Sequence, residues 1–356
     1  MQGNKTKAKE DIRTRLLLII FLAFSLRMID VSIPCHHPQP DERFLLEAAT
    51  QPALRDTIRF TAADTHPPLY FIILRGWLKI LPKNYDSPKL LSMIFNTANI
   101  FLTFILAQLW LNKKTALLTA LVMALSPWNI YWSHLARNHQ MLPVFFTLST
   151  LALFRWLRSG TKKIPVCYCI IAAIMIHTNY LAFFILASQG AIALWECRRN
   201  LRRLFMPAIA ACLAVASYSP YLSALKYHIT EGPMNPGCFQ HVVSPIYLFY
   251  HFLFFNIFTC NLGHLWYPPP SHPAPLLSGG LVLALVGIKA VKKIPDVSFY
   301  ILLLLPPTLS VFIGWLKGTT MAERYLAYAV GPFAILFAAG LAEIAASGKP
   351  HDLMKG

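Results

Sequence analysis

The sequence is divided into long apolar blocks separated by short basic clusters, from one end of the chain to the other. Several blocks approach the roughly 20 residues that an α-helix needs to cross the hydrocarbon core of a membrane. Of the 356 residues, 56% are hydrophobic and only 13% are charged, whereas a soluble domain carries about a quarter charged residues. The pattern therefore predicts an all-α polytopic membrane protein with the lipid bilayer as a partner.

The basic residues set the expected orientation of the chain. The 32 Lys and Arg against 15 Asp and Glu would suggest nucleic acid as the partner of a soluble protein. Here they lie in short clusters between apolar blocks, where an excess of Lys and Arg marks cytoplasmic loops. We therefore expect no nucleic-acid partner. The clusters placed in the cytoplasm are Lys113-Lys114, Lys162-Lys163, Arg198-Arg199 and Lys292-Lys293.

About ten blocks, within a range of nine to twelve, are expected to cross the membrane. They lie at residues 16–29, 89–111, 115–128, 140–157, 165–176, 180–195, 204–221, 281–291, 299–316 and 325–344. The first block lacks a small-residue cleavage site, so we expect it to remain as a helix whose N-terminus is cytoplasmic. Residues 1–345 then form one integral-membrane domain with outer loops at 30–88 and 223–278, followed by a cytoplasmic tail at 346–356.

Two shorter apolar blocks, residues 67–81 and 246–258, could either cross the membrane or lie in its outer interface. The first carries Arg75 and Lys79 and is short for a span. If it crossed, Lys113-Lys114 and every later basic cluster would change sides. The charge pattern therefore favours an interfacial or re-entrant helix for both blocks.

In this topology the reactive side chains gather on the outer face. Transporters instead place ionisable groups near the middle of the membrane, where this sequence has few apart from Arg27 and Gln189. The outer-face residues are His36, His37, Asp41, Glu42, Asp64, His66, Tyr70, His134, Arg137, His177, Tyr180, Arg324 and Tyr325.

Each of these elements also has a purely structural interpretation. The run Asp41-Glu42-Arg43 could begin a solvated helix, because acids are favoured in the first turn. His66 could support the Pro67-Pro68 turn, and Arg137 could anchor the chain at the membrane interface. The order of the elements along the chain distinguishes these interpretations better than any single motif.

In that order the sequence resembles the bacterial branch of the dolichyl-phosphate-mannose-protein mannosyltransferase family, within the GT-C superfamily of integral-membrane glycosyltransferases. The resemblance runs from about residue 16 to about residue 345. The matching pieces are Arg27, Asp41-Glu42-Arg43, Asp64-Thr65-His66-Pro67-Pro68-Leu69-Tyr70, Leu125-Ser126-Pro127, Tyr131-Trp132-Ser133, Ala136-Arg137, His177, Tyr180, Gln189, Ser219-Pro220-Tyr221 and Glu323-Arg324-Tyr325-Leu326.

One position departs from the family pattern. Members often read Gln-Glu-Ala-Arg in the second outer turn, whereas this chain reads His134-Leu135-Ala136-Arg137. The acid is missing at Leu135, which puts in doubt any role of that position in binding an acceptor or a cation.

The resemblance implies an inverting, mannosyltransferase-like enzyme of the inner (plasma) membrane. It would move one sugar from a polyprenyl-phosphate donor to an extracytoplasmic acceptor, which could be a glycan, a lipid or a protein. Asp41 is the implied catalytic base, with Glu42 second. His66, Arg137 and Arg324 are implied ligands of the donor phosphate.

Further roles follow from the same resemblance. Asp64, His36 and His37 are candidates for a divalent cation or the acceptor, and Tyr70, His134, His177, Tyr180 and Tyr325 are other outer-face candidates. Two rival interpretations stay open: a membrane transporter, and a catalytically silent relative that lacks the acid at Leu135.

Overall fold

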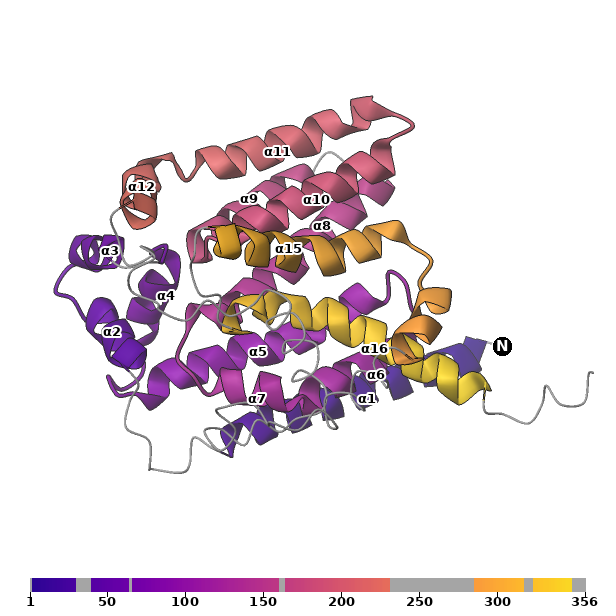
Figure 1. Cartoon of the computed structure of the whole chain (residues 1–356). Helices are drawn as coiled ribbons and strands as arrows, with labels where there is room; N and C mark the ends of the chain where they lie inside the picture. The colour runs from indigo at the N-terminus through magenta and orange to yellow at the C-terminus, as the bar shows by residue number, and fades with distance from the viewer. Residues whose placement is uncertain are drawn as a thin grey trace, which may run out of the picture.

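The computed structural model describes residues 2–29, 40–63, 66–159, 164–230, 285–316 and 323–347. Within these ranges the secondary structure is helical and no strand occurs. The predicted all-α fold is therefore confirmed. The longer helices run side by side as a bundle (Figure 1). They are α1 (Gln2–Met28), α5 (Asp86–Ala107), α6 (Lys113–Leu125), α8 (Met141–Ser159), α9 (Ile164–Thr178), α10 (Ala182–Cys197), α11 (Phe205–Ala216), α15 (Val297–Leu316) and α16 (Val330–Ser347); residues 285–293 are helical too.

Short helices connect the longer ones. The α-helices among them are α2 (Pro40–Ala49), α3 (Leu54–Ala62), α4 (Leu69–Trp77), α7 (Pro127–Ser133) and α12 (Leu222–Thr230), and the 3-10 helices are η1 (Asn138–Gln140), η2 (Leu201–Leu204), η3 (Ser219–Tyr221) and η6 (Glu323–Ala329). Figure 1 shows α2, α3, α4 and α12 together at one end of the bundle, which we call the site end. The outer loop expected from residue 223 begins as helix α12. Just before it, Pro220 occupies the first turn of η3, a position that proline favours.

Several helices match the length and composition of membrane spans. Among the described residues, four stretches are long and apolar enough, and three shorter apolar helices accompany them. The four are Asp86–Ala107, Asn138–Ser159, Leu201–His228 and Leu326–Ser347, and the three are Pro165–Thr178, Ala182–Cys197 and Val297–Ile313. The chain is a multi-pass membrane protein, as its apolar blocks predict.

Helix α4 bears on the ambiguous block at residues 67–81. It has nine residues and is therefore about 14 Å long, about half the thickness of the hydrocarbon core. Phe71 of α4 packs edge-on against Phe44 of α2 with ring centroids 6.0 Å apart. These features support a helix that covers the end of the bundle without crossing the membrane. The second ambiguous block, residues 246–258, lies outside the described residues.

The loops near the basic clusters meet at the other end of the bundle, which we call the basic end. Trp110 Nε1, just after α5, donates a hydrogen bond of 2.6 Å to Asp296 Oδ2, just before α15. Arg203 Nη2 donates to the carbonyl oxygen of Leu157 at the end of α8, at 2.5 Å. Figure 1 shows the N-terminus of α1 at this end as well. Lys113-Lys114, Arg198-Arg199 and Lys292-Lys293 therefore lie at the same end of the bundle, whereas Lys162-Lys163 lies outside the described residues.

We expect the basic end to face the cytoplasm. In a variant without the seven native cysteines, a single cysteine replacing Lys113 should react with a membrane-impermeant maleimide only after cells are permeabilised. Ile80, which is 81% exposed and follows α4 at the site end, provides the matched position: Ile80→Cys should react in intact cells. Labelling of Lys113→Cys in intact cells would mean that the orientation is reversed.

Polar side chains inside the bundle are bound to one another. The side-chain amide nitrogen of Gln189 in α10 donates hydrogen bonds to Ser149 Oγ at 2.8 Å and Thr150 Oγ1 at 3.1 Å. Its side-chain oxygen Oε1 accepts a hydrogen bond of 2.9 Å from the Tyr168 hydroxyl. These contacts join α8, α9 and α10, and such interhelical bonds stabilise membrane bundles. Gln189 therefore has a structural role.

Candidate active site

Seven of the predicted outer-face side chains are described, and all lie at the site end: Glu42, His66, Tyr70, His134, Arg137, His177 and Tyr180. His36, His37 and Asp64 lie outside the described residues. The main chains of Asp41, Arg324 and Tyr325 are helical, in α2 and η6, but their side chains are outside the described part of the structure.

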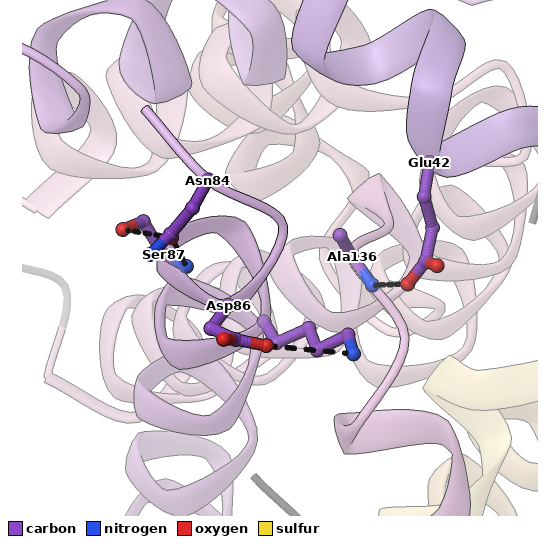
Figure 2. A network of polar contacts seen from close by, with 6 residues as sticks. Glu42, Asn84, Asp86, Ser87 and Ala136 are labelled. Carbon is purple, nitrogen blue, oxygen red and sulfur yellow. Dashed lines mark hydrogen bonds and ion pairs between the residues drawn. The ribbon is translucent and has the colours of Figure 1, made fainter. Parts of the chain in front are cut away.

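Glu42 lies in the first turn of α2, which begins with Pro40, a residue favoured at the first helical position. The structural interpretation of this acid pair as a helix start is therefore correct for the backbone. Glu42 is also buried, at 5% exposure, and its Oε1 accepts a hydrogen bond of 3.3 Å from the main-chain N–H of Ala136. Figure 2 shows the carboxylate pointing from α2 toward this main chain. Glu42 thus binds the residue directly before Arg137.

Arg137 is buried at the start of η1. The residue is 8% exposed. Its main-chain N–H donates a hydrogen bond of 3.3 Å to Ser92 Oγ of α5. The N–H groups of Ala136 and Arg137 are therefore held by two different helices, α2 and α5. An arginine that only anchors the chain at a lipid interface would be more exposed.

Tyr70 of α4 is fully buried beside these groups. Burial raises the pKa of Tyr70 to about 12; Glu42 adds to the rise, and the Ser92 hydroxyl and the Arg137 guanidinium oppose it. At neutral pH the phenol is therefore protonated and able to donate. Glu42, Tyr70, Ser92 and Arg137 form what we call the Arg137 cluster. A guanidinium beside a phenol can bind an oxyanion such as a phosphate, because both donate hydrogen bonds.

A polar network beneath the cluster holds the turn that carries Arg137. Arg27 of α1 is 0% exposed, and its Nε donates to Asn96 Oδ1 at 2.7 Å. Asn96 Nδ2 in turn donates to Gln140 Oε1 at 2.7 Å. His134 Nε2 lies 2.8 Å from the carbonyl oxygen of Arg27, to which it can donate. His134 and Gln140 therefore tie both sides of Arg137 to the bundle.

His66 lies beside the same turn. Its ring centroid is 6.0 Å from that of His139 in η1, with the rings 65° apart. Its carbonyl oxygen accepts a hydrogen bond of 3.4 Å from the Tyr221 hydroxyl. The structure therefore brings His66 to the turn that carries Arg137, although the two are 71 residues apart in the sequence.

His177 and Tyr180 form a second group, which we call the Tyr180 cluster together with Tyr218 and His228. Tyr180 Oη lies 2.7 Å from His228 Nδ1. The ring of Tyr218 is 5.1 Å from that of His177 and 6.2 Å from that of Tyr180. The sequence analysis did not select Tyr218 or His228. The only available signal for His228 was a histidine in the apolar stretch that continues beyond Pro220.

The start of α5 lies in the same region (Figure 2). Ser87 is bound to Asn84, whose Oδ1 accepts from the Ser87 N–H at 3.0 Å. Two residues further, Lys89 forms an ion pair of 3.7 Å with Asp86. The Lys89 side chain is 14% exposed, so it adds a largely buried cation at the site end that the sequence analysis did not select.

No group of three His, Cys, Asp or Glu side chains with metal-binding geometry occurs among the described residues. The residues that the resemblance offers for a divalent cation, Asp64, His36 and His37, lie outside those ranges. A metal site therefore stays a prediction at these three positions.

Comparison with known proteins agrees with this architecture. The family model described as dolichyl-phosphate-mannose-protein mannosyltransferase matches residues 65–223. The structure of ArnT from Cupriavidus metallidurans in the apo state has a TM-score of 0.64 and 13% identity over 92% of this chain and 59% of that chain. The structure of the same protein bound to undecaprenyl phosphate has a TM-score of 0.57 and 14% identity over 95% of this chain and 60% of that chain.

The Archaeoglobus fulgidus oligosaccharyltransferase in complex with zinc and sulfate gives a TM-score of 0.55 and 13% identity over 94% of this chain and 49% of that chain. This chain thus spans between about half and three-fifths of the length of these proteins. No curated protein sequence matches it.

The chain therefore has the fold of ArnT and of the archaeal oligosaccharyltransferase. Residues 65–223, which are less than half of the chain, match the model of the dolichyl-phosphate-mannose-protein mannosyltransferase family. The resemblance seen in the sequence motifs is thereby confirmed.

Proposed function

We propose that this protein is an inverting, mannosyltransferase-like glycosyltransferase that uses a polyprenyl-phosphate sugar. It would pass the sugar to an acceptor hydroxyl on the extracytoplasmic side of the inner (plasma) membrane. The observation that carries the proposal is the Arg137 cluster, where a buried guanidinium and a protonated phenol lie beside the start of α2. The likeness to ArnT, whose structure binds undecaprenyl phosphate, supports a lipid phosphate as the anion.

In the proposed reaction, the acceptor oxygen attacks the anomeric carbon of the donor sugar. The bond between that carbon and the phosphate oxygen breaks, and its electron pair leaves with the polyprenyl phosphate. The acceptor proton passes to the carboxylate of Asp41, which acts as the general base. Arg137, His66 and Arg324 bind the phosphate, where negative charge increases in the transition state.

The contacts of Glu42 favour Asp41 over Glu42 as the base. Glu42 Oε1 is engaged by the Ala136 N–H, and this bond holds the main chain that carries Arg137. Glu42 is therefore proposed as a residue that positions Arg137, and the neighbouring Asp41 takes the proton. Glu42 would act through geometry, so a neutral side chain that keeps a hydrogen-bond acceptor should replace it.

The direct test uses the purified protein with polyprenyl-phosphate mannose and measures release of polyprenyl phosphate. A glycosyltransferase of this type should cleave this donor, or another polyprenyl-phosphate hexose in a panel. A transporter would move the intact lipid across vesicles, and a silent relative would bind it without cleavage. Absence of cleavage of every donor by a folded, donor-binding protein would overturn the proposal. If a donor is cleaved, sugar analysis of the envelope of a deletion strain would identify the product.

The proposed phosphate ligands give a specific prediction for donor binding. Arg137→Ala and Arg324→Ala should each raise the donor dissociation constant at least about tenfold, equivalent to about 1.4 kcal/mol. Arg137→Lys should restore binding only in part, because the guanidinium can donate two parallel hydrogen bonds. Arg59 is an exposed arginine of α3 at the same end, so Arg59→Ala serves as the control and should leave affinity unchanged.

Donor affinity can be measured by titration in detergent or nanodiscs. Unchanged affinity in a folded Arg137→Ala variant would remove Arg137 from the phosphate site. Unchanged affinity in Arg324→Ala would assign Arg324 to the interface as a snorkelling side chain.

A further inference from the structure

The short connection between α3 and α4 is held on both sides by one segment of the chain. On its α3 side, the carbonyl oxygen of Ala62 lies 2.8 Å from His228 Nε2 of α12. On its α4 side, the carbonyl oxygen of His66 accepts from Tyr221 of η3. His228 is 0% exposed. Segment 219–230 therefore contacts the chain on both sides of this connection, and His66 on its α4 side is a proposed phosphate ligand.

The contacts of His228 determine its tautomer. A carbonyl oxygen can only accept, so His228 Nε2 must carry the hydrogen that it shares with Ala62. In the neutral imidazole, Nδ1 then accepts the hydroxyl hydrogen of Tyr180 at 2.7 Å. His228 is thereby bound through both ring nitrogens, to α3 on one side and to the start of α10 on the other.

We propose that His228 is a positioning residue for the donor site. Through Ala62 it fixes the end of α3, and with Tyr221 it sets where His66 lies relative to His139 and the turn that carries Arg137. This inference rests on the proposed function, since it assigns His228 a role in the same phosphate site. Tyr221, which binds the carbonyl oxygen of His66, and His228, which binds that of Ala62, belong to the same helical segment 219–230, so a shift of this segment acts on both residues. Misplacement of a ligand by about 1 Å can cost up to about a hundredfold in rate.

The two bonds of His228 can be separated by substitution. His228→Asn can keep an acceptor near the position of Nδ1 for Tyr180, but its shorter side chain cannot reach Ala62. His228→Gln can keep a donor near the position of Nε2 for Ala62, but it lacks the acceptor for Tyr180. Tyr180→Phe removes only the phenol oxygen and leaves the bond to Ala62. The proposal requires the bond to Ala62 to be the important one.

Steady-state kinetics with polyprenyl-phosphate mannose, or the hexose donor that the wild type uses, give the first measurement. His228→Asn should lower kcat/KM for the donor about tenfold, mainly by raising KM. His228→Gln should stay within about twofold of the wild type, and Tyr180→Phe should lower kcat/KM less than His228→Asn does. The second measurement is hydrogen exchange of the peptide that contains Ala62 and His66, which should become faster in His228→Asn and stay unchanged in His228→Gln.

Each outcome supports or overturns the inference. If His228→Asn matches the wild type in KM and in exchange, or if all three variants lose activity equally, His228 does not position this connection. An equal fall in Tm for the two His228 variants with unchanged KM would indicate a purely structural role and would also overturn it. If the wild type cleaves no donor, the proposed function fails, while the exchange measurement still tests whether His228 holds Ala62.

Discussion

Replacing Asp41 by Asn is expected to reduce sugar transfer by about 10² to 10⁴, the usual cost of losing a general base. Asparagine keeps the shape and hydrogen-bonding capacity of the side chain but cannot take the acceptor proton. Donor affinity should be retained, because the proposed phosphate ligands Arg137 and His66 are unchanged. Single-turnover transfer at saturating donor, together with a binding titration, measures the two quantities separately.

Glu42 provides the matched control for this experiment. Since Glu42 Oε1 accepts from the Ala136 N–H, Glu42→Gln keeps an acceptor and should retain most activity. Glu42→Ala removes that acceptor and should weaken donor binding through Arg137. If Glu42→Gln is inactive and Asp41→Asn is not, Glu42 is the base. If neither substitution matters, the acid pair serves only as the start of α2.

Gly340→Ala is expected to destabilise the bundle severely. A Cβ atom at Gly340 of α16 would overlap the carbonyl oxygen of Val286 and lie 3.0 Å from its carbonyl carbon. These are main-chain atoms of the helix at residues 285–293, so no side-chain rotation can relieve the overlap. Overpacking of this kind typically costs about 1–3 kcal/mol and sometimes more. A lower Tm and a smaller folded fraction in detergent would be the measured result.

Gly190 of α10 provides the comparison for that substitution. A Cβ at Gly190 would meet nothing within 4 Å, and alanine is the better helix former by about 1 kcal/mol. Gly190→Ala should therefore leave Tm unchanged or raise it. If Gly340→Ala also had the wild-type Tm, the two helices would not be in contact at residues 286 and 340.

The helices could be predicted from the sequence because each span carries its own signal. A block such as residues 89–111 is apolar over most of its length, whatever its neighbours are, and it becomes α5. The choice at residues 67–81 followed from the basic clusters later in the chain, which would change sides if this block crossed the membrane, and α4 is short as that choice requires.

The contacts of the site could not be predicted in the same way. Ser92 binds the main chain of Arg137, and His228 binds that of Ala62, 166 residues away. A serine in an apolar block and a histidine after one have many structural roles, and nothing local selects one of them. The motif order identified Glu42 and Arg137, but the bond from Glu42 to Ala136 depends on how α2 folds over the bundle.

The burial of Arg27 bears on the order in which the chain assembles in the membrane. An arginine near the end of an isolated helix can extend to the interface and keep its water. In the folded protein, Arg27 instead binds Asn96 of α5 and the carbonyl oxygens of Met123 and Ala124 near the end of α6. Helix α1 can therefore exchange water for these partners only after α5 and α6 have been inserted, so its docking cannot come before the insertion of α6.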